Sequence, residues 1–191
     1  MSAKTSTRGS ARERLLTAAS ELFYEEGVHT VGVDRVIERA GVAKASLYST
    51  FGSKDGLVRA YLDARHESTR ARLNAELARH DSPRDRLVGI FEMQQRRCAD
   101  PDYRGCPFVR ASAESEPGSA VEAASDAHRE WMHSVFRELS AEAGAADPDE
   151  LARALGVLYD GAVLATWMDR DSAAAAAAVR TARMLVDAAV A

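Results

Sequence analysis

Helical periodicity runs through almost the whole sequence and limits what a chain like this can fold into. Apolar residues recur at intervals of three and four from about residue 10 to the end, and no stretch shows the strict alternation with β-branched enrichment that is typical of strands. Alanine, leucine, arginine and glutamate, which are common here, favour helices. The pattern therefore predicts an all-α fold.

Capping residues divide this pattern into nine predicted helices. Ser10 with Glu13, and Ser119 with Glu122, have the S-x-x-E spacing in which each side chain bonds the backbone N–H of the other residue. The predicted helices begin near residues 10, 33, 44, 53, 82, 107, 119, 147 and 172. A serine, or the aspartate at position 147, is the expected N-cap at six of these starts.

The predicted helices fall into a small unit and a larger one. We expect a polar, disordered tail at residues 1–9, a three-helix head at residues 10–56, and a second domain at residues 57–191. The helix predicted from Ser53 to about Arg79 joins the head to the larger domain.

Composition favours a soluble, cytoplasmic protein. Hydrophobic residues make up 46% of the chain and charged residues 28%. No apolar run is long enough to cross a bilayer, and the first ten residues lack the apolar segment of a secretory signal. The two cysteines, Cys98 and Cys106, are too few for a disulfide scaffold and lack zinc-finger spacing, so we expect no metal and no cofactor.

Charge is distributed unevenly along the chain. The formal net charge is -4, yet residues 1–60 carry nine Lys+Arg against seven Asp+Glu, and the remainder carries 16 against 22. A mildly basic end on an acidic body is consistent with one surface that faces DNA.

Residues 33–51 have the anatomy of a helix-turn-helix. Two short predicted helices are joined by a tight turn at residues 41–43, and Leu47 and Phe51 of the second helix share one inward face. The other side chains of that helix are small, hydroxyl-bearing or basic, which suits a DNA major groove. They are Lys44, Ala45, Ser46, Tyr48, Ser49 and Thr50. A compact helical hairpin without a DNA partner is the alternative that this anatomy leaves open.

Residues 33–57, VDRVIERAGVAKASLYSTFGSKDGL, resemble the N-terminal signature of the TetR/AcrR family. The shared run is A-G-V-x-K-x-x-L-Y-x-x-F-x-S-K-x-x-L, and the resemblance covers roughly residues 10–60. It implies a nine-helix TetR-like architecture with a C-terminal ligand-binding and dimerisation domain. It further implies a homodimeric regulator, typically a repressor, that binds a palindromic operator in double-stranded DNA and is released by a small-molecule effector.

The resemblance also implies roles for individual residues. Lys44, Ala45 and Ser46 occupy the leading edge of the recognition helix. Tyr48 matches a tyrosine that packs against or bonds the sugar-phosphate backbone, and Lys54 matches a phosphate-binding lysine.

Three further positions belong to the predicted DNA contacts but depart from the family pattern or are ambiguous. Ser49 and Thr50 stand where the family often has an aromatic residue and a histidine that touch phosphates, so a contact here would come from hydroxyl groups. Arg35 can reach DNA from the preceding helix, or it can be a solvated surface arginine.

Aromatic, sulfur-containing and polar side chains gather in the middle helices of the larger domain. An apolar cavity with a few convergent polar groups is what a small-molecule site needs, and the family resemblance implies a cavity in helices four to seven. The candidate ligand-binding residues are His66, Phe91, Gln94, Cys98, Phe108, Glu114, His128, Trp131 and Met132. Plain core packing is the alternative for each of them.

Cys106 precedes Pro107 at a predicted helix N-terminus, where a thiol can have a lowered pKa and react with oxidants or electrophiles. The alternative, a small buried residue in a tight turn, is the interpretation that we favour. Cys98 raises the same question.

The last two predicted helices carry apolar residues with 4-3-4-3 spacing. A terminal helix that is apolar on two sides must be covered on both, by its own subunit and by a partner. The predicted dimer-interface residues are Leu151, Leu155, Leu158, Ala162, Ala178, Ala182 and Leu185. A helix buried within one subunit is the alternative.

Two other classes of protein compete with the regulator. An enzyme could assemble His66, His128 and Glu114 into a catalytic site, but the common metalloprotease, nucleophile-elbow and phosphate-loop motifs are absent from the sequence. A helical interaction protein whose head no longer binds DNA is compatible with the short Ser49 and Thr50. The sequence favours a DNA-binding regulator that is not an enzyme, and it leaves repression and activation both open.

Overall fold

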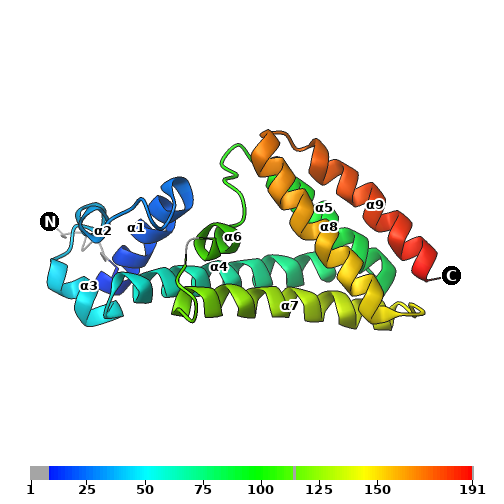
Figure 1. Ribbon diagram of the computed structural model, residues 1–191, viewed down its shortest axis with the longest axis horizontal. Helices are drawn as coiled ribbons and strands as arrows, with labels where there is room; N and C mark the ends of the chain where they lie inside the picture. The colour runs from blue at the N-terminus through cyan, green and yellow to red at the C-terminus, as the bar shows by residue number, and fades with distance from the viewer. Residues whose placement is uncertain (1–8, 114, 191) are drawn as a thin grey trace, which may run out of the picture.

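The computed structural model describes residues 9–113 and 115–190, and within these ranges it contains nine α-helices and no strand (Figure 1). The all-α prediction is therefore confirmed. The helices are α1 (Ala11–Glu26), α2 (Val33–Ala40), α3 (Lys44–Phe51), α4 (Lys54–Leu77), α5 (Pro83–Cys98), α6 (Pro107–Ser112), α7 (Ala120–Glu142), α8 (Pro148–Asp169) and α9 (Ala173–Ala189). None of them is both long enough and apolar enough to cross a membrane.

Most of the helix starts follow from the capping residues that the sequence offers. The Ser10 hydroxyl accepts from the backbone N–H of Glu13 at 3.2 Å, and the Glu13 carboxylate accepts from the N–H of Ser10 at 2.8 Å. Ser53, Ser82 and Asp147 each accept from the N–H three residues later at 3.0 Å. These side chains satisfy amide groups that have no partner inside the helix, so α1, α4, α5 and α8 begin where predicted.

Two predicted caps differ in detail. The Ser119 hydroxyl caps α7, but the Glu122 carboxylate bonds the N–H of Gly118 rather than that of Ser119, so only half of the capping box forms. Ser172 precedes α9 without a side-chain hydrogen bond, because its ψ of 1° lies outside the extended region that capping residues adopt. The carboxylate of Asp171 caps α9 instead, at 3.0 Å from the first N–H of the helix.

The helices form an elongated molecule with α1–α3 at one end (Figure 1). α4 runs from this end into the middle of the molecule beside α7, and α5, α8 and α9 pack together at the other end. The predicted division at residue 57 falls inside α4, which continues through it. The short α6 lies close to both α4 and α7.

Two apolar cores lie along this axis. The first joins α1–α3 and the start of α4 with four buried residues of α6 and α7, namely Phe108, Ala111, Val121 and Ala124. The second joins the later part of α4 with α5, α7, α8 and α9. Because α6 and α7 contribute to the first core, the helix-turn-helix end is packed against the larger part of the chain.

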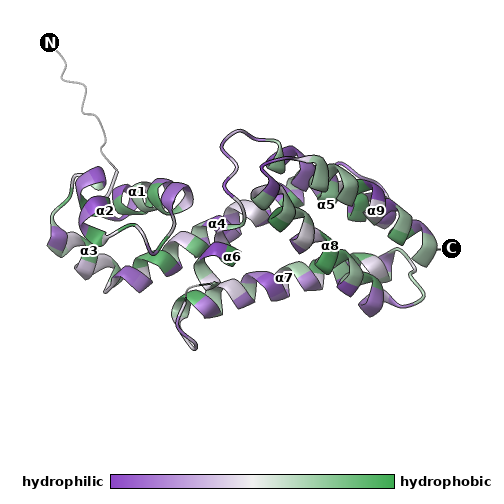
Figure 2. Ribbon diagram, turned by 45° about the horizontal axis from the view of Figure 1, so that its top comes forward, coloured by the Kyte–Doolittle hydropathy of each residue, from purple (hydrophilic) through white to green (hydrophobic). Residues whose placement is uncertain are grey.

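The apolar stripe that we predicted as a dimer seam instead faces the chain's own core. Figure 2 shows hydrophobic residues along much of α8. Five of the seven predicted residues are buried within the single chain, namely Leu151, Leu155, Ala162, Ala178 and Ala182. Leu158 and Leu185 are partly buried against the same core. In the single chain these five offer no surface to a partner, because α8 packs on α7 and α9, and α9 on α5, whereas Leu158 and Leu185 keep part of theirs exposed.

Candidate nucleic-acid interface and internal cavities

The turn between α2 and α3 is fixed by Gly41 and Arg14. Gly41 ends α2 with φ 60° and ψ 44°, a left-handed conformation that glycine adopts without steric cost. The Arg14 guanidinium of α1 donates to the carbonyl oxygen of Gly41 at 2.7 Å, and a Cβ added at Gly41 would lie 2.8 Å from the same side chain. The turn is therefore held against α1, which sets the angle at which α3 leaves it.

α3 buries one face and exposes the others. Leu47 is fully buried in the first core, and Phe51 is partly buried against it. The predicted DNA-contact residues on the other faces are all exposed except Ser46, which is partly exposed, and Tyr48 keeps 45% of its surface accessible. Since α3 lies at the tip of the molecule, its outer face is open to a large partner (Figure 1).

The polar side chains of α3 already have contacts within the chain. Lys44 Nζ lies 2.8 Å from the Asp34 carboxylate, and this hydrogen bond, with the charge of Asp34, raises the pKa of Lys44. The hydroxyls of Ser49 and Thr50 donate to the carbonyl oxygen of Ser46 at 3.2 and 2.6 Å. A phosphate would compete with Asp34 for Lys44, whereas the two hydroxyl oxygens keep acceptor capacity for a donor.

Arg35 and Lys54 flank this surface. Arg35 forms an ion pair with Glu26, and about half of its side chain, 52%, remains exposed. Lys54 begins α4, and its Nζ lies 3.5 Å from the carbonyl oxygen of His29. A cation at the first residue of a helix, beside backbone N–H groups, is placed as a phosphate contact requires.

The comparisons with known proteins agree with this geometry. Residues 15–61 match the family model described as "Bacterial regulatory proteins, tetR family". The solved structure of SCO4454, a TetR-family transcriptional regulator from Streptomyces coelicolor, is 32% identical, with a TM-score of 0.90, over 95% of this chain and 96% of that one. The chain belongs to the TetR family of transcriptional regulators.

Two further solved structures are similar to this TetR-family chain. The TetR-type regulator sav143 of Streptomyces avermitilis is 34% identical with a TM-score of 0.86, covering 95% of this chain and 98% of that one. A cysteine mutant of the TetR-family regulator CifR, solved with a 26-base-pair double-stranded operator DNA, is 26% identical with a TM-score of 0.78, covering 93% and 98%. The chain is thus a member of a DNA-binding regulator family and not an enzyme.

The larger part of this TetR-family chain contains two adjacent cavities. One, of about 220 Å³, lies between α6, α7 and α8, and the other, of about 340 Å³, lies between α4, α5 and the segment that leads into α6. They share five lining residues, which form the wall between them, namely Cys106, Phe108, His128, Tyr159 and Val163. Each is lined mainly by apolar surface with a few polar groups, as a small-molecule site requires.

The structure brings five of the nine predicted ligand-binding residues to these cavities. Gln94, Cys98, Phe108, His128 and Met132 line one or both of them. The remaining predictions fall elsewhere. Phe91 is fully buried in the second core, and His66 and Trp131 pack behind His128 without being part of either lining. Glu114 lies outside the described residues.

His128 stands in the wall between the cavities. Its ring stacks on Phe108 with centroids 3.7 Å apart and an interplanar angle of 6°. Its Nδ1 lies 3.0 Å from Nδ1 of His66. Burial, and secondarily the neighbouring His66, lower the pKa of His128 to about 4. His128 is therefore neutral at physiological pH and presents an aromatic, uncharged wall to both cavities.

The two cysteines do not have the environment of reactive thiols. Burial raises the pKa of Cys106, although the N–H groups of α6 act in the opposite direction. Burial likewise raises the pKa of Cys98. Because the thiolate is the reactive form, a raised pKa argues against the sensor hypothesis and for the packing interpretation favoured from the sequence.

The ligand-binding residues predicted from the sequence did not include the arginines of the larger cavity. Arg65, Arg72, Arg96 and Arg97 all line it. Arg65 and Arg72 are seven residues apart on α4 and so share a helix face, which is the signal that a search for cationic periodicity would have found.

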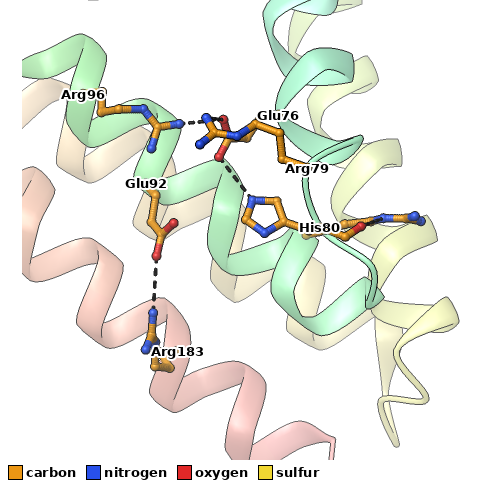
Figure 3. A network of polar contacts seen from close by, with 7 residues as sticks. Glu76, Arg79, His80, Glu92, Arg96 and Arg183 are labelled. Atoms are coloured by element: carbon orange, nitrogen blue, oxygen red, sulfur yellow. Dashed lines mark hydrogen bonds and ion pairs between the residues drawn. The ribbon is translucent and has the colours of Figure 1, made fainter.

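One cluster has a geometry that could hold a metal ion. Among the described residues, Glu76, His80 and Glu92 bring three ligand atoms within 4.8 Å of one another. Figure 3 shows that both carboxylates form ion pairs with arginines. Arg96 lies 2.6 Å from the carboxylate of Glu76, and Arg183 lies 3.3 Å from that of Glu92. Burial acts to raise the pKa of Glu76, but the bonds from Arg96 and His80 lower it overall. We interpret the cluster as an ion-pair network that fastens α4 to α5 and α9.

Proposed function

We propose that this chain is a transcriptional repressor that binds a palindromic operator as a homodimer and is released by a small-molecule effector. The observation that carries the proposal is the division of α3, whose Leu47 is fully buried while its polar face is open at the tip of the molecule. The proposed DNA contacts are Arg35, Lys44, Ala45, Ser46, Tyr48, Ser49, Thr50 and Lys54. The site of action is the cytoplasm, where chromosomal DNA lies.

The proposed dimer uses the outer faces of α8 and α9. Val157, Leu164 and Met168 on α8 and Met184 on α9 are large apolar side chains that remain exposed in the single chain, with Val157, Met168 and Met184 at least 66% accessible. Val157, Gly161, Leu164 and Met168 follow i, i+4, i+7, i+11 spacing and so share one stripe. Exposed apolar stripes of this kind are typical of protein interfaces. A twofold dimer would present its two α3 helices to major grooves about 34–36 Å apart.

The proposed effector site is the pair of cavities. Residues of α4, α6 and α7 contribute to their walls. The start of α4 also packs with α3 in the first core, so α4 connects the cavities to the recognition helix. A ligand can bind best to a conformation in which the two helix-turn-helix ends of the dimer are spaced differently from successive major grooves. Because such a ligand stabilises a conformation that does not fit the operator, it lowers the affinity for DNA.

The experiment is fluorescence anisotropy of labelled DNA from the region flanking the chain's own gene. We expect saturable binding to a near-palindrome, weakened by added salt because phosphate contacts release counterions. Lys44→Ala and Tyr48→Ala should each weaken it at least about tenfold, since both residues lie on the exposed face of α3. Arg137→Ala, at an exposed position on α7 outside the proposed interface, is the matched control.

Equal affinity for the flanking DNA and for a scrambled duplex, or full affinity of both α3 variants, would contradict DNA recognition through α3. A reporter gene placed behind the bound sequence then separates repression from activation. Repression requires lower expression with the protein present, and higher expression would overturn that part of the proposal.

A further inference from the structure

The larger cavity has an unusual charge. Four arginine side chains line it, together with Tyr24, Tyr103 and Gln94, and no carboxylate belongs to its lining among the described residues. A cavity whose charged groups are all cations has a positive potential, which favours an anion inside it.

Two of the four arginines have carboxylate partners outside the cavity. Arg96 lies 2.6 Å from Glu76, and Arg97 lies 3.0 Å from Asp100. The other two, Arg65 and Arg72, form no ion pair with any described residue.

Arg65 and Arg72 have only neutral hydrogen-bond partners in the described part of the chain. Arg65 donates to the carbonyl oxygen of Ser20 at 3.1 Å, and its Nε is buried without a hydrogen-bond partner. Arg72 donates to the hydroxyls of Ser68 and Thr69. Partial burial, together with repulsion from Arg97 and Arg65, lowers the pKa of Arg72, although part of its side chain is exposed. An oxyanion between these guanidinium groups would relieve that repulsion.

The rest of the cavity wall is apolar or aromatic. Met93, Pro107, Phe108 and Val163 contribute to it, and the neutral His128 stacks on Phe108. A volume of about 340 Å³ is at the small end of the range for ligand sites. A fitting ligand therefore combines one anionic group with a compact apolar body.

The same arginines hold a residue of the DNA-binding end. Arg97 Nη2 donates to the hydroxyl of Tyr24 at 2.6 Å, and the Arg65 guanidinium lies 4.3 Å from the centroid of the Tyr24 ring. The N–H of Arg104 also donates to the Tyr24 hydroxyl, at 3.0 Å. Tyr24 belongs to the last turn of α1, so the groups that would bind an anion also fix the position of α1.

We propose that the larger cavity binds a small organic carboxylate with an apolar body, through Arg65, Arg72 and Arg97, and that this binding alters the hold of Arg65 and Arg97 on Tyr24. The inference rests on the proposed effector function and names the chemical class of the effector. Arg72 is the anion contact that has no part in holding Tyr24, whereas Tyr24 is a positioning residue that relays occupancy to α1.

The first test measures binding without DNA. The full chain is titrated by calorimetry at neutral pH with phenylacetate, 3-phenylpropanoate and 4-phenylbutyrate, with their uncharged amides, and with inorganic phosphate. We expect at least one acid to bind at least about tenfold more tightly than its amide, because a charge-assisted hydrogen bond is lost. Phosphate should bind more weakly than that acid, because it has no apolar body. Equal affinity of acid and amide, equal affinity of phosphate, or no binding by any of the acids at millimolar concentration would overturn the proposal.

A matched pair of variants on α4 locates the anion. Arg72→Gln should weaken binding of the acid about tenfold or more, while Arg70→Gln, an exposed neighbour paired with Glu67, should leave it unchanged. Equal affinities of the two variants would place the anion elsewhere. A melting curve of each variant shows that the fold is intact.

The second test separates binding from coupling. Tyr24→Phe removes the hydroxyl that Arg97 and Arg104 hold and keeps the aromatic ring on Arg65. We expect this variant to bind the acid at least as tightly as the parent, because Arg97 is no longer shared with the Tyr24 hydroxyl, but to lose most of the ligand-induced change in operator affinity. An unchanged ratio of operator affinities with and without the acid would overturn the role of Tyr24. Absence of operator binding by the parent chain would instead overturn the proposed function and leave the calorimetric result standing.

Discussion

Nδ1 of His66 on α4 and Nδ1 of His128 on α7 lie 3.0 Å apart, so one imidazole must donate and the other must accept. Only one proton can occupy that contact, and a second would break the hydrogen bond by placing two N–H donors against each other and would add a positive charge in a partly buried site. This pair joins two long helices at the level of the cavities, which makes packing there sensitive to protonation.

The first prediction is a loss of stability in mild acid. The pKa of His128 is lowered to about 4 from its ordinary 6.5. The unfolded chain therefore binds more protons between these values. The stability contributed by neutral His128 is complete above about pH 6.5, decreases progressively as the pH falls from there to about 4, and is lost below that, by about 3 kcal/mol in total. Urea unfolding at a series of pH values measures it.

His128→Phe keeps a ring to stack on Phe108 and removes the titrating group. Its stability should change less between pH 7 and pH 4.5 than that of the parent chain. If the free energy of unfolding depended on pH in the same way for both proteins, His128 would not be the cause of the acid sensitivity.

The second prediction separates folding from DNA binding on adjacent residues of α3. Leu47 is fully buried and Tyr48 is 45% exposed. Leu47→Ala should lower the free energy of unfolding by about 2–5 kcal/mol, because it leaves a cavity in the first core. Tyr48→Ala should change it by less than about 0.5 kcal/mol and still weaken operator binding. Equal destabilisation by both changes would contradict the assignment of the two faces.

The third prediction concerns Gly161 in the exposed stripe of α8. A Cβ placed there meets no atom within 4 Å in the single chain, so Gly161→Arg fits the subunit and gains helix propensity. In the proposed dimer it would bury a charge, and the dimer dissociation constant should rise about a hundredfold or more. Sedimentation velocity measures the change.

Ala141→Arg, at an exposed position on α7, is the control for Gly161→Arg. It should leave the dimer intact. A Gly161→Arg protein that sediments as the parent does would rule out this face as the interface.

The fourth prediction tests the ion-pair network in Figure 3. Glu76 is only 5% exposed, and Arg79, His80 and Arg96 all contact its carboxylate. Glu76→Gln should lower the free energy of unfolding by about 1–3 kcal/mol, because the carboxylate that accepts several charge-assisted hydrogen bonds is removed. Glu67→Gln, which affects one exposed pair with Arg70, should cost less than about 0.5 kcal/mol. Thermal melting compares them, and similar costs would show that the network adds little.

The helix-turn-helix and most helix boundaries could be predicted from the sequence because their causes are local. Ser10, Ser53 and Ser82 bond amides three residues away, and Gly41 takes a backbone conformation that glycine adopts without steric cost. Such contacts are visible in a short window of sequence.

The dimer stripe and the arginine cavity could not be predicted because their causes are not local. Apolar spacing shows that the Leu151–Leu155 face is covered, but not that its own chain covers it. In the same way, nothing in the sequence indicates that Arg72 on α4 and Arg97 on α5 lie near each other. Only the packing of the two helices shows that they share a cavity and that Arg72 has no carboxylate partner among the described residues.

The continuity of α4 has a geometric consequence for the proposed release from the operator. Its 24 residues span both cores without a break. A helix of that length is about 36 Å long, so tilting it by about 5° at the cavity end displaces the other end by about 3 Å. That is close to the rise of one base pair, about 3.4 Å. In the proposed dimer, a change no larger than the shift of a few side chains around a bound molecule would therefore be enough to take the two α3 helices out of phase with the DNA.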